Sequence, residues 1–176
     1  MIKVNEKQFV QILPTIMNNG GAVYVRPATT LVHLGLNTNI DENYCVQNNI
    51  PVFRVQRLGG AIVSHPNDYD FVVIEPKTYD GSRPALFQKL IHTFLKNNLT
   101  AVFENNDLLV DGYKVASYSY RELDNGMLYL AMHISMSVDL ELIKSICKKE
   151  MIKIPKGLND FGIYEDTIDK LITETY

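Results

Sequence analysis

One stretch of the sequence decides the fold of this chain, namely Asn106-Asp107-Leu108-Leu109-Val110-Asp111-Gly112-Tyr113-Lys114-Val115-Ala116-Ser117. Residues 108–110 and 113–116 have the β-branched and aromatic bias of short strands. Between them, Asp111-Gly112 is a strong signal for a two-residue hairpin turn. The stretch therefore predicts two antiparallel strands joined by a tight turn.

The polar residues of this hairpin lie at its ends. Asn106 and Asp107 lead into the first strand, and Lys114 lies early in the second. Because the two strands of a hairpin lie side by side, a carboxylate and an ammonium group can converge on one ligand. The pattern alone favours an ordinary surface hairpin with solvated charges.

Length and composition exclude several classes of protein. A chain of 176 residues with 46% hydrophobic and 21% charged residues is expected to form one globular domain, residues 1–176. The net charge of −3 gives no electrostatic footprint for nucleic acid. Apolar runs such as 71–74 are too short to span a membrane, and residues 1–7 lack the apolar core of a signal peptide. Cys45 and Cys147 form no disulfide framework, so we expect a cytoplasmic protein.

The predicted elements are mixed in order, which favours an α+β fold with mixed or antiparallel sheets flanked by helices. Pro14 predicts a break or kink in the first helix, Ser82 is a candidate helix cap, and Pro155 to Gly157 predicts a turn. Helices are expected at 6–18, 41–49, 82–98, 139–147 and from 166, and strands at 22–26, 31–36, 52–56, 70–75, 100–103 and 128–137, besides the hairpin.

Two further groups of residues have the chemistry of a binding site. Gly59-Gly60 would let backbone N–H groups approach a phosphate or carboxylate closely, although paired glycines are often a turn or bulge. His65 follows on the same segment as a candidate base or an ordinary loop histidine.

Arginines form the second group. Arg54, Arg57 and Arg121 are candidates for an anion pocket, and Arg121 is also next to a possible partner, Glu122.

The order and spacing of these groups over about residues 31–160 resemble the biotin/lipoate protein ligase superfamily, most of all a short, divergent lipoate-protein ligase A. Its Gly-Gly loop, which cradles an acyl-adenylate, is similar to Arg57, Gly59, Gly60 and Ala61. Its Asn-Asp-Leu motif and essential lysine are similar to residues 106–108 and Lys114, and its downstream Tyr-Arg-Glu to residues 120–122.

The resemblance implies activation of lipoate, or of octanoate or biotin, as an acyl-adenylate with ATP and Mg²⁺, and transfer to a lysine of a lipoyl-type carrier domain. Lys114 would be catalytic, and Asp107 would hold the metal. The loop residues together with Asn106, Asp107 and Arg121 would bind the nucleotide. Val63, Phe71 and Val73 are candidates for an apolar tunnel. A shortened N-terminus and the lack of an accessory C-terminal domain are also expected.

The sequence departs from the ligase pattern at several positions. Leu58 stands at a glycine position, and Gln56 precedes Arg57 where an arginine pair is usual, so either Arg54 or Arg57 is a candidate for the family arginine. Residues 116–119 replace a Ser-Gly-Ser run, and Ala131-Met132 replace a His-Gly pair. Bulkier residues at these positions would narrow the acyl pocket or abolish activity.

Two alternatives remain. The octanoyltransferase branch has a Gly-Gly-x-x-x-x-His motif similar to Gly59, Gly60 and His65, and uses a cysteine nucleophile, for which Cys147 is the candidate. The surroundings of Cys147 lack the expected Pro-Cys-Gly, and Asn106-Asp107 is a ligase feature. The second alternative is a relative that binds a small acid, a nucleotide or a protein without catalysis.

Overall fold

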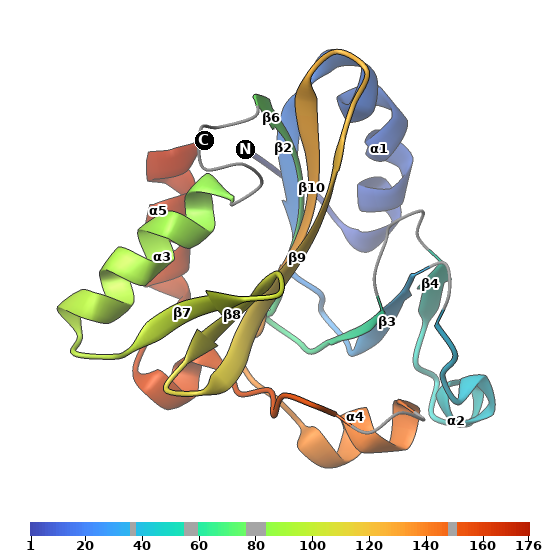
Figure 1. Ribbon diagram of the computed structural model, residues 1–176. Coiled ribbons are helices and arrows are strands. Elements are labelled where there is room, and N and C mark those ends of the chain that lie inside the picture. The colour runs from blue at the N-terminus through green and yellow to red at the C-terminus, as the bar shows by residue number, and fades with distance from the viewer. Residues whose placement is uncertain (36–37, 55–59, 77–83, 148–150) are drawn as a thin grey trace.

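The chain folds into two β-sheets with helices packed against them (Figure 1). The computed structural model describes residues 1–176 except 36–37, 55–59, 77–83 and 148–150. Within the described residues, the larger sheet has the strand order β1 (Ile2–Lys3), β2 (Gly21–Val25), β6 (Tyr69–Pro76), β10 (Met127–Ile134), β9 (Tyr113–Glu122), β8 (Asp107–Val110) and β7 (Ala101–Glu104). The smaller sheet has the order β4 (Val52–Arg54), β3 (Leu31–Leu34) and β5 (Ala61–Ser64).

Helices cover both faces of the larger sheet and one end of the smaller sheet (Figure 1). α3 and α5 lie together on one face, α1 covers the other face, and α2 and α4 pack with the smaller sheet. The helices are α1 (Glu6–Asn19), α2 (Glu42–Gln47), α3 (Ala85–Lys96), α4 (Leu140–Ile146), α5 (Glu165–Thr175) and the short 3₁₀ helix η1 (Leu158–Phe161). The predicted α+β fold is confirmed.

The alternation of side chains along β6 explains why the sheet is covered on both faces. Tyr69, Phe71 and Val73 belong to the core beneath α3 and α5, whereas Val72 and Ile74 pack on the side of α1. Successive strand residues point to opposite faces, so a strand that is apolar at nearly every position needs helices on both sides. Each fully buried side chain of this size contributes about 1.5–3 kcal/mol of apolar burial.

The last three strands of the larger sheet form a meander with two tight turns. Asn105 and Asn106 join β7 to β8 with φ angles of 50° and 66°, and Asp111 and Gly112 join β8 to β9 with φ angles of 49° and 84°. Two consecutive residues with positive φ match the right-handed twist of a hairpin. The predicted hairpin at residues 111–112 is confirmed, and Asn106 has a structural reason for being asparagine.

Three details of the helices and turns differ from the sequence predictions. α1 continues past Pro14 without interruption, because losing one backbone donor does not end a helix that is packed on a sheet. The candidate cap Ser82 lies outside the described residues, and α3 instead begins after Pro84. Residues 155–157 are extended rather than a turn, since Pro155 forms a bridge to Lys114 of β9.

Residues 151–157, called the strap below, attach to the beginning of β9. The Lys114 N–H donates to the carbonyl of Ile154 over 3.0 Å, and the Lys156 N–H donates to the carbonyl of Lys114 over 2.9 Å. Both backbone groups of Lys114 are thus satisfied by the strap. Among the described helices, none is long and apolar enough to cross a membrane.

Candidate active site

A pocket of about 550 Å³ lies between the two sheets, at the place where the hairpin meets β5. One wall is the segment 60–62, which begins β5 of the smaller sheet. The opposite wall comes from the turn at 105–107, from β9 and from β10 of the larger sheet. The described residues that line it are Gly60, Ala61, Ile62, Asn105, Asn106, Asp107, Lys114, Ser117, Tyr118, Ser119, Tyr120 and Ala131.

Lys114 and Asp107 meet at this pocket, as the hairpin pattern indicated. The Lys114 Nζ lies 2.9 Å from the Asp107 Oδ1, and their side chains are 34% and 18% exposed. A β-bulge between β8 and β9 produces this geometry, because Leu108 pairs with Ala116 whereas Leu109 pairs with Lys114, which leaves Val115 as the extra residue.

The bulge turns Lys114 toward the pocket. Val115 and Ala116 are consecutive in sequence, yet both are buried in the core beneath α3 and α5. An extra residue in one strand reverses the alternation of faces on either side of it. Lys114 consequently lines the pocket together with Ser117 and Ser119, whereas a regular strand would direct its ammonium group into the apolar core.

A second lysine, Lys153 of the strap, binds the other oxygen of Asp107. Its Nζ lies 3.1 Å from the Asp107 Oδ2 and donates to the Glu104 carbonyl over 2.9 Å. The Glu104 carboxylate lies 3.5 Å away. The sequence analysis did not find Lys153, which is separated from Asp107 by 46 residues and sits in a segment with the composition of a turn.

Gly60 faces the hairpin across the pocket, and the packing of the described residues does not require a glycine there. A Cβ atom added at Gly60 would have only the Thr38 Oγ1 within 4 Å among the described atoms, at 4.0 Å. Gly60 is also absent from the described glycines with positive φ. A glycine that neither the fold nor the turn geometry demands leaves room for the close approach of a ligand to the backbone.

The structure brings five of the residues predicted from sequence to the pocket, namely Gly60, Ala61, Asn106, Asp107 and Lys114. Ala131, which stands where a His-Gly pair was expected, lines it too. Arg57 and Gly59 lie outside the described residues. Their roles at this site, like those of the five residues, stay predictions.

Four other candidates lie away from the described wall of the pocket. Arg54 is exposed on β4 and pairs with Glu42 of α2. Arg121 lies over the ring of Tyr129 with its Cζ 5.1 Å from the ring centre. Cys147 ends α4 and packs in the core of the smaller sheet, where burial raises the pKa of its thiol. His65 is buried, and its Nε2 accepts from the Asp139 N–H over 3.1 Å.

The three residues proposed for an acyl tunnel also lie elsewhere. Phe71 and Val73 are buried in the core beneath α3 and α5, and Val63 is buried in the core of the smaller sheet. Apolar strand residues look alike in sequence whether they line a cavity or fill a core. Within the described residues, the apolar side chains of the pocket are instead Ala61, Ile62 and Ala131, with Tyr118 and Tyr120.

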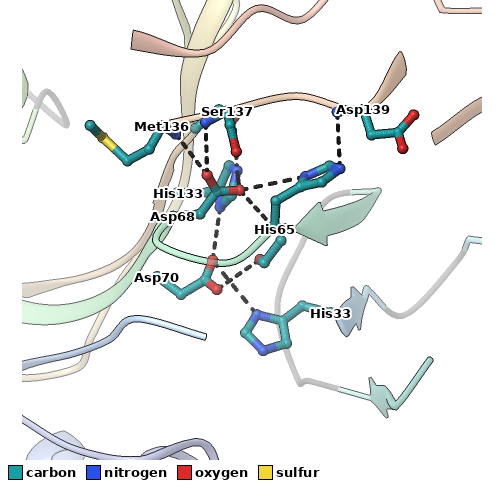
Figure 2. A network of polar contacts seen from close by, with 10 residues as sticks. His33, His65, Asp68, Asp70, His133, Met136, Ser137 and Asp139 are labelled. Atoms are coloured by element: carbon teal, nitrogen blue, oxygen red, sulfur yellow. Dashed lines mark hydrogen bonds and ion pairs between the residues drawn. The ribbon is translucent and has the colours of Figure 1, made fainter. Parts of the chain in front are cut away.

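A buried polar network joins the two sheets immediately beyond the pocket (Figure 2). The His133 Nδ1 lies 2.9 Å from the Asp70 Oδ1, and the Ser64 hydroxyl donates to the Asp70 Oδ2 over 2.7 Å. His33 of β3 lies 3.9 Å from the same carboxylate. Ser64 and His133 each lie two residues beyond a pocket residue, Ile62 on β5 and Ala131 on β10, so they continue the same strand faces.

Asp68 fixes the loop after β5 to the segment between β10 and α4 in the same network (Figure 2). Its Oδ2 accepts from the His65 N–H over 2.7 Å, and its Oδ1 accepts from the Met136 N–H over 2.7 Å. Asp68 has no exposed surface, so these bonds replace the water that a carboxylate would otherwise keep. The sequence analysis singled out only His65 of this network, because His33, His133 and residues 136–139 are far from residues 64–70 along the chain.

The network holds the Asp70 carboxylate in its charged form. Burial alone raises the pKa of Asp70, but the charge of His33 and the hydrogen bonds from His133 and Ser64 outweigh burial and lower the pKa to about 2. The carboxylate therefore stays ionised at neutral pH although it is almost completely buried.

Two ammonium groups occupy the position at Asp107 where the resemblance to the ligases would place a magnesium ion. Both carboxylate oxygens already hold ammonium groups, from Lys114 and Lys153. Among the described residues, no group of three or more histidine, cysteine, aspartate or glutamate side chains is placed to share a metal ion. A metal at Asp107 would have to displace an ammonium group, so no step proposed below depends on one.

The fold thus places a pocket between Lys114 of the hairpin and the start of β5. Residues 19–164 match the model of the lipoyl protein ligase A/B catalytic domain. This chain belongs to that family. No curated protein matches the sequence.

Solved structures with similar folds include several lipoate-protein ligases. P. falciparum LipL1 in complex with lipoate has a TM-score of 0.80 and 12% identity, over 99% of this chain and 60% of that chain. A bi-partite lipoate protein ligase from Thermoplasma acidophilum, described with its E2 lipoyl domain, has a TM-score of 0.77 and 14% identity, over 99% and 80%. A lipoate-protein ligase A bound with ATP has a TM-score of 0.75 and 13% identity, over 99% and 81%. At these identities the likeness shows the shared fold.

Proposed function

We propose that this protein activates lipoate, or another short carboxylic acid, as an acyl-adenylate with ATP and transfers the acyl group to a lysine of a carrier domain. The observation that carries the proposal is the position of Lys114. A bulge directs its ammonium group into a pocket that is also lined by Asn106, Asp107 and the Gly60 backbone. The resemblance to the ligases implies that these groups act together on the substrate.

In the first step, the acid's carboxylate attacks the α-phosphorus of ATP and pyrophosphate leaves. Lys114 would neutralise the carboxylate and hold it in place, and Asp107 would fix the direction of the ammonium group. The open side of Gly60 would let backbone groups lie close to the α-phosphate. Ile62 and Ala131 would contact the apolar part of the acid.

In the second step, the amine of the carrier lysine attacks the carbonyl carbon of the adenylate, AMP leaves, and an amide bond forms. Negative charge develops on the carbonyl oxygen in the transition state, where the Lys114 ammonium would stabilise it. Loss of one such donor typically costs about 10²–10³-fold in rate.

The octanoyltransferase alternative needs a reactive thiolate, and the structure offers no support for one at Cys147. Burial raises the pKa of this thiol and so favours its uncharged form. Cys147 also packs with Ile146 and Ile40 in the core of the smaller sheet.

Mass spectrometry of the protein mixed with Mg-ATP and lipoate, octanoate or biotin tests the proposal. We expect one acyl-adenylate to form, and Lys114→Gln to lower its rate by about 10²-fold or more. Lys144→Gln is the matched control, since Lys144 is an exposed lysine that pairs with Glu141.

Two results would overturn the ligase proposal. One is equal adenylate formation by the Lys114→Gln variant. The other is an octanoyl adduct on Cys147, formed from an octanoyl-carrier donor without ATP. If none of the acids reacts, the alternative of a relative that binds without catalysis is favoured over the ligase.

A further inference from the structure

The ammonium group of Lys153 occupies a cage of oxygen atoms of the kind that binds a cation. The Glu104 carbonyl lies 2.9 Å from the Nζ, the Asp107 Oδ2 lies 3.1 Å away, and the Glu104 Oε1 lies 3.5 Å away. Carboxylate and carbonyl oxygens are also the ligands that hard divalent cations choose. Glu104 and Asp107 face each other across the two-residue turn between β7 and β8, so the turn itself builds the cage.

The strap is oriented so that Lys153 points inward. Its neighbours Ile152 and Ile154 are 97% and 54% exposed, whereas the Lys153 side chain is 17% exposed. Apolar side chains are usually buried and charged side chains exposed, and the strap shows the reverse arrangement. The strap is therefore held near Asp107 by the ion pairs of Lys153 and by its backbone bonds to Lys114.

Lys114 and Lys153 bind different oxygen atoms of the Asp107 carboxylate. Lys114 takes Oδ1 and Lys153 takes Oδ2, so the carboxylate cannot rotate without breaking both contacts. With the Glu104 and Asp107 carboxylates facing the two ammonium groups, the local charges balance before any ligand enters.

We propose that Lys153 is a positioning residue that takes the place of a metal ion on Asp107 and thereby holds Oδ1 toward Lys114. The inference rests on the proposed function for the role of Lys114. Its structural part, that an ammonium group excludes a divalent cation from the cage, stands without that function.

Electron paramagnetic resonance of Mn²⁺, without ATP or acid, tests the structural part. We expect no Mn²⁺ binding to the cage of the wild-type protein. Lys153→Met opens the cage and should bind Mn²⁺ at least tenfold more tightly than the wild type. Adding Asp107→Asn to Lys153→Met should abolish the gain, and Lys153→Arg should bind no more Mn²⁺ than the wild type.

Lys156→Met is the matched control, because Lys156 is on the same strap but its Nζ lies over the rings of Tyr113 and Phe161, 4.9 Å from each ring centre. Lys153→Gln serves as a second opening variant if Lys153→Met fails to fold. Wild-type Mn²⁺ binding that Asp107→Asn removes, or no gain in either opening variant, would overturn the proposal.

Adenylation kinetics test the positioning role separately. Lys153→Met should lower kcat about tenfold with a smaller change in KM for the acid, and Lys153→Arg should restore most of kcat. An unchanged kcat would overturn the positioning role. If the wild type forms no adenylate, the proposed function fails while the Mn²⁺ result still decides whether Lys153 replaces a metal.

Discussion

Gly157 provides the sharpest test of how the strap is fixed to the rest of the chain. A Cβ atom at this position would lie 2.4 Å from the Met136 carbonyl oxygen and 2.6 Å from the Ser137 Cα. Ordinary contact begins at 3.4 Å, and both neighbours are backbone atoms that no side-chain rotation can move away. Gly157→Ala must therefore separate the strap from the end of β10 by about 1 Å.

The cost of this separation follows from the bonds around Gly157. The Leu158 N–H donates to the Ser135 carbonyl over 2.9 Å, and the Asn159 N–H donates to the Met136 carbonyl over 3.2 Å. A movement of about 1 Å breaks or weakens both, at about 1 kcal/mol each, and overpacking adds about 1–3 kcal/mol. We expect Gly157→Ala to lower the free energy of unfolding by about 3–5 kcal/mol and Tm by roughly 6–20 °C.

Urea unfolding followed by circular dichroism measures this change. Gly60→Ala is the control, because a Cβ there would lie 4.0 Å from the Thr38 Oγ1 and in an ordinary backbone conformation. We expect the control to stay within about 0.5 kcal/mol of the wild type. A Gly157→Ala variant as stable as the control would refute the close approach between residues 136–137 and 157.

Three further predictions concern the network, the thiol and the turn. Because the pKa of Asp70 falls from 3.8 to about 2 on folding, its charged form contributes about 2 kcal/mol that is present above pH 3.8 and is lost as the pH falls toward 2. Urea unfolding at pH 7 and pH 3 should show about 1 kcal/mol of this loss in the wild type and a smaller loss in Asp70→Asn; equal losses would contradict it. Cys147→Ser should leave adenylate formation and acyl transfer unchanged by mass spectrometry, whereas loss of transfer would assign the thiol a role. Asn106→Gly permits the same positive φ angle, so its free energy of unfolding should stay within about 1 kcal/mol of the wild type. Calorimetry should show that the variant binds ATP about tenfold more weakly. Unchanged ATP binding would mean that Asn106 serves only the turn.

The hairpin could be predicted from the sequence because its determinants are local. Asp111 and Gly112 supply the two positive φ angles, and apolar strand residues flank them. Lys114 and Asp107 could be placed together for the same reason, since a hairpin brings its own ends into contact. The mixed order of strands and helices was likewise enough to indicate the α+β class.

The features that complete the site depend on contacts between distant segments. The bulge at Val115 changes which face Lys114 occupies, yet the alternation of residues 113–119 does not reveal an extra residue. Lys153 reaches Asp107 through a segment that Pro155 and Gly157 made look like a turn. Asp70 looks like the polar first residue of a strand until His33 and His133 are brought to it from two other strands.

The polar network between the sheets also bears on how the specificity of this domain can be redesigned. Apolar surfaces can slide past each other at little cost, whereas the bonds of Asp68 and Asp70 allow one register between β5, β6 and β10. The two walls of the pocket are consequently held at a fixed spacing. Attempts to accept a larger or smaller acid should therefore change Ile62 or Ala131, which line the pocket, and leave the carboxylates behind them intact.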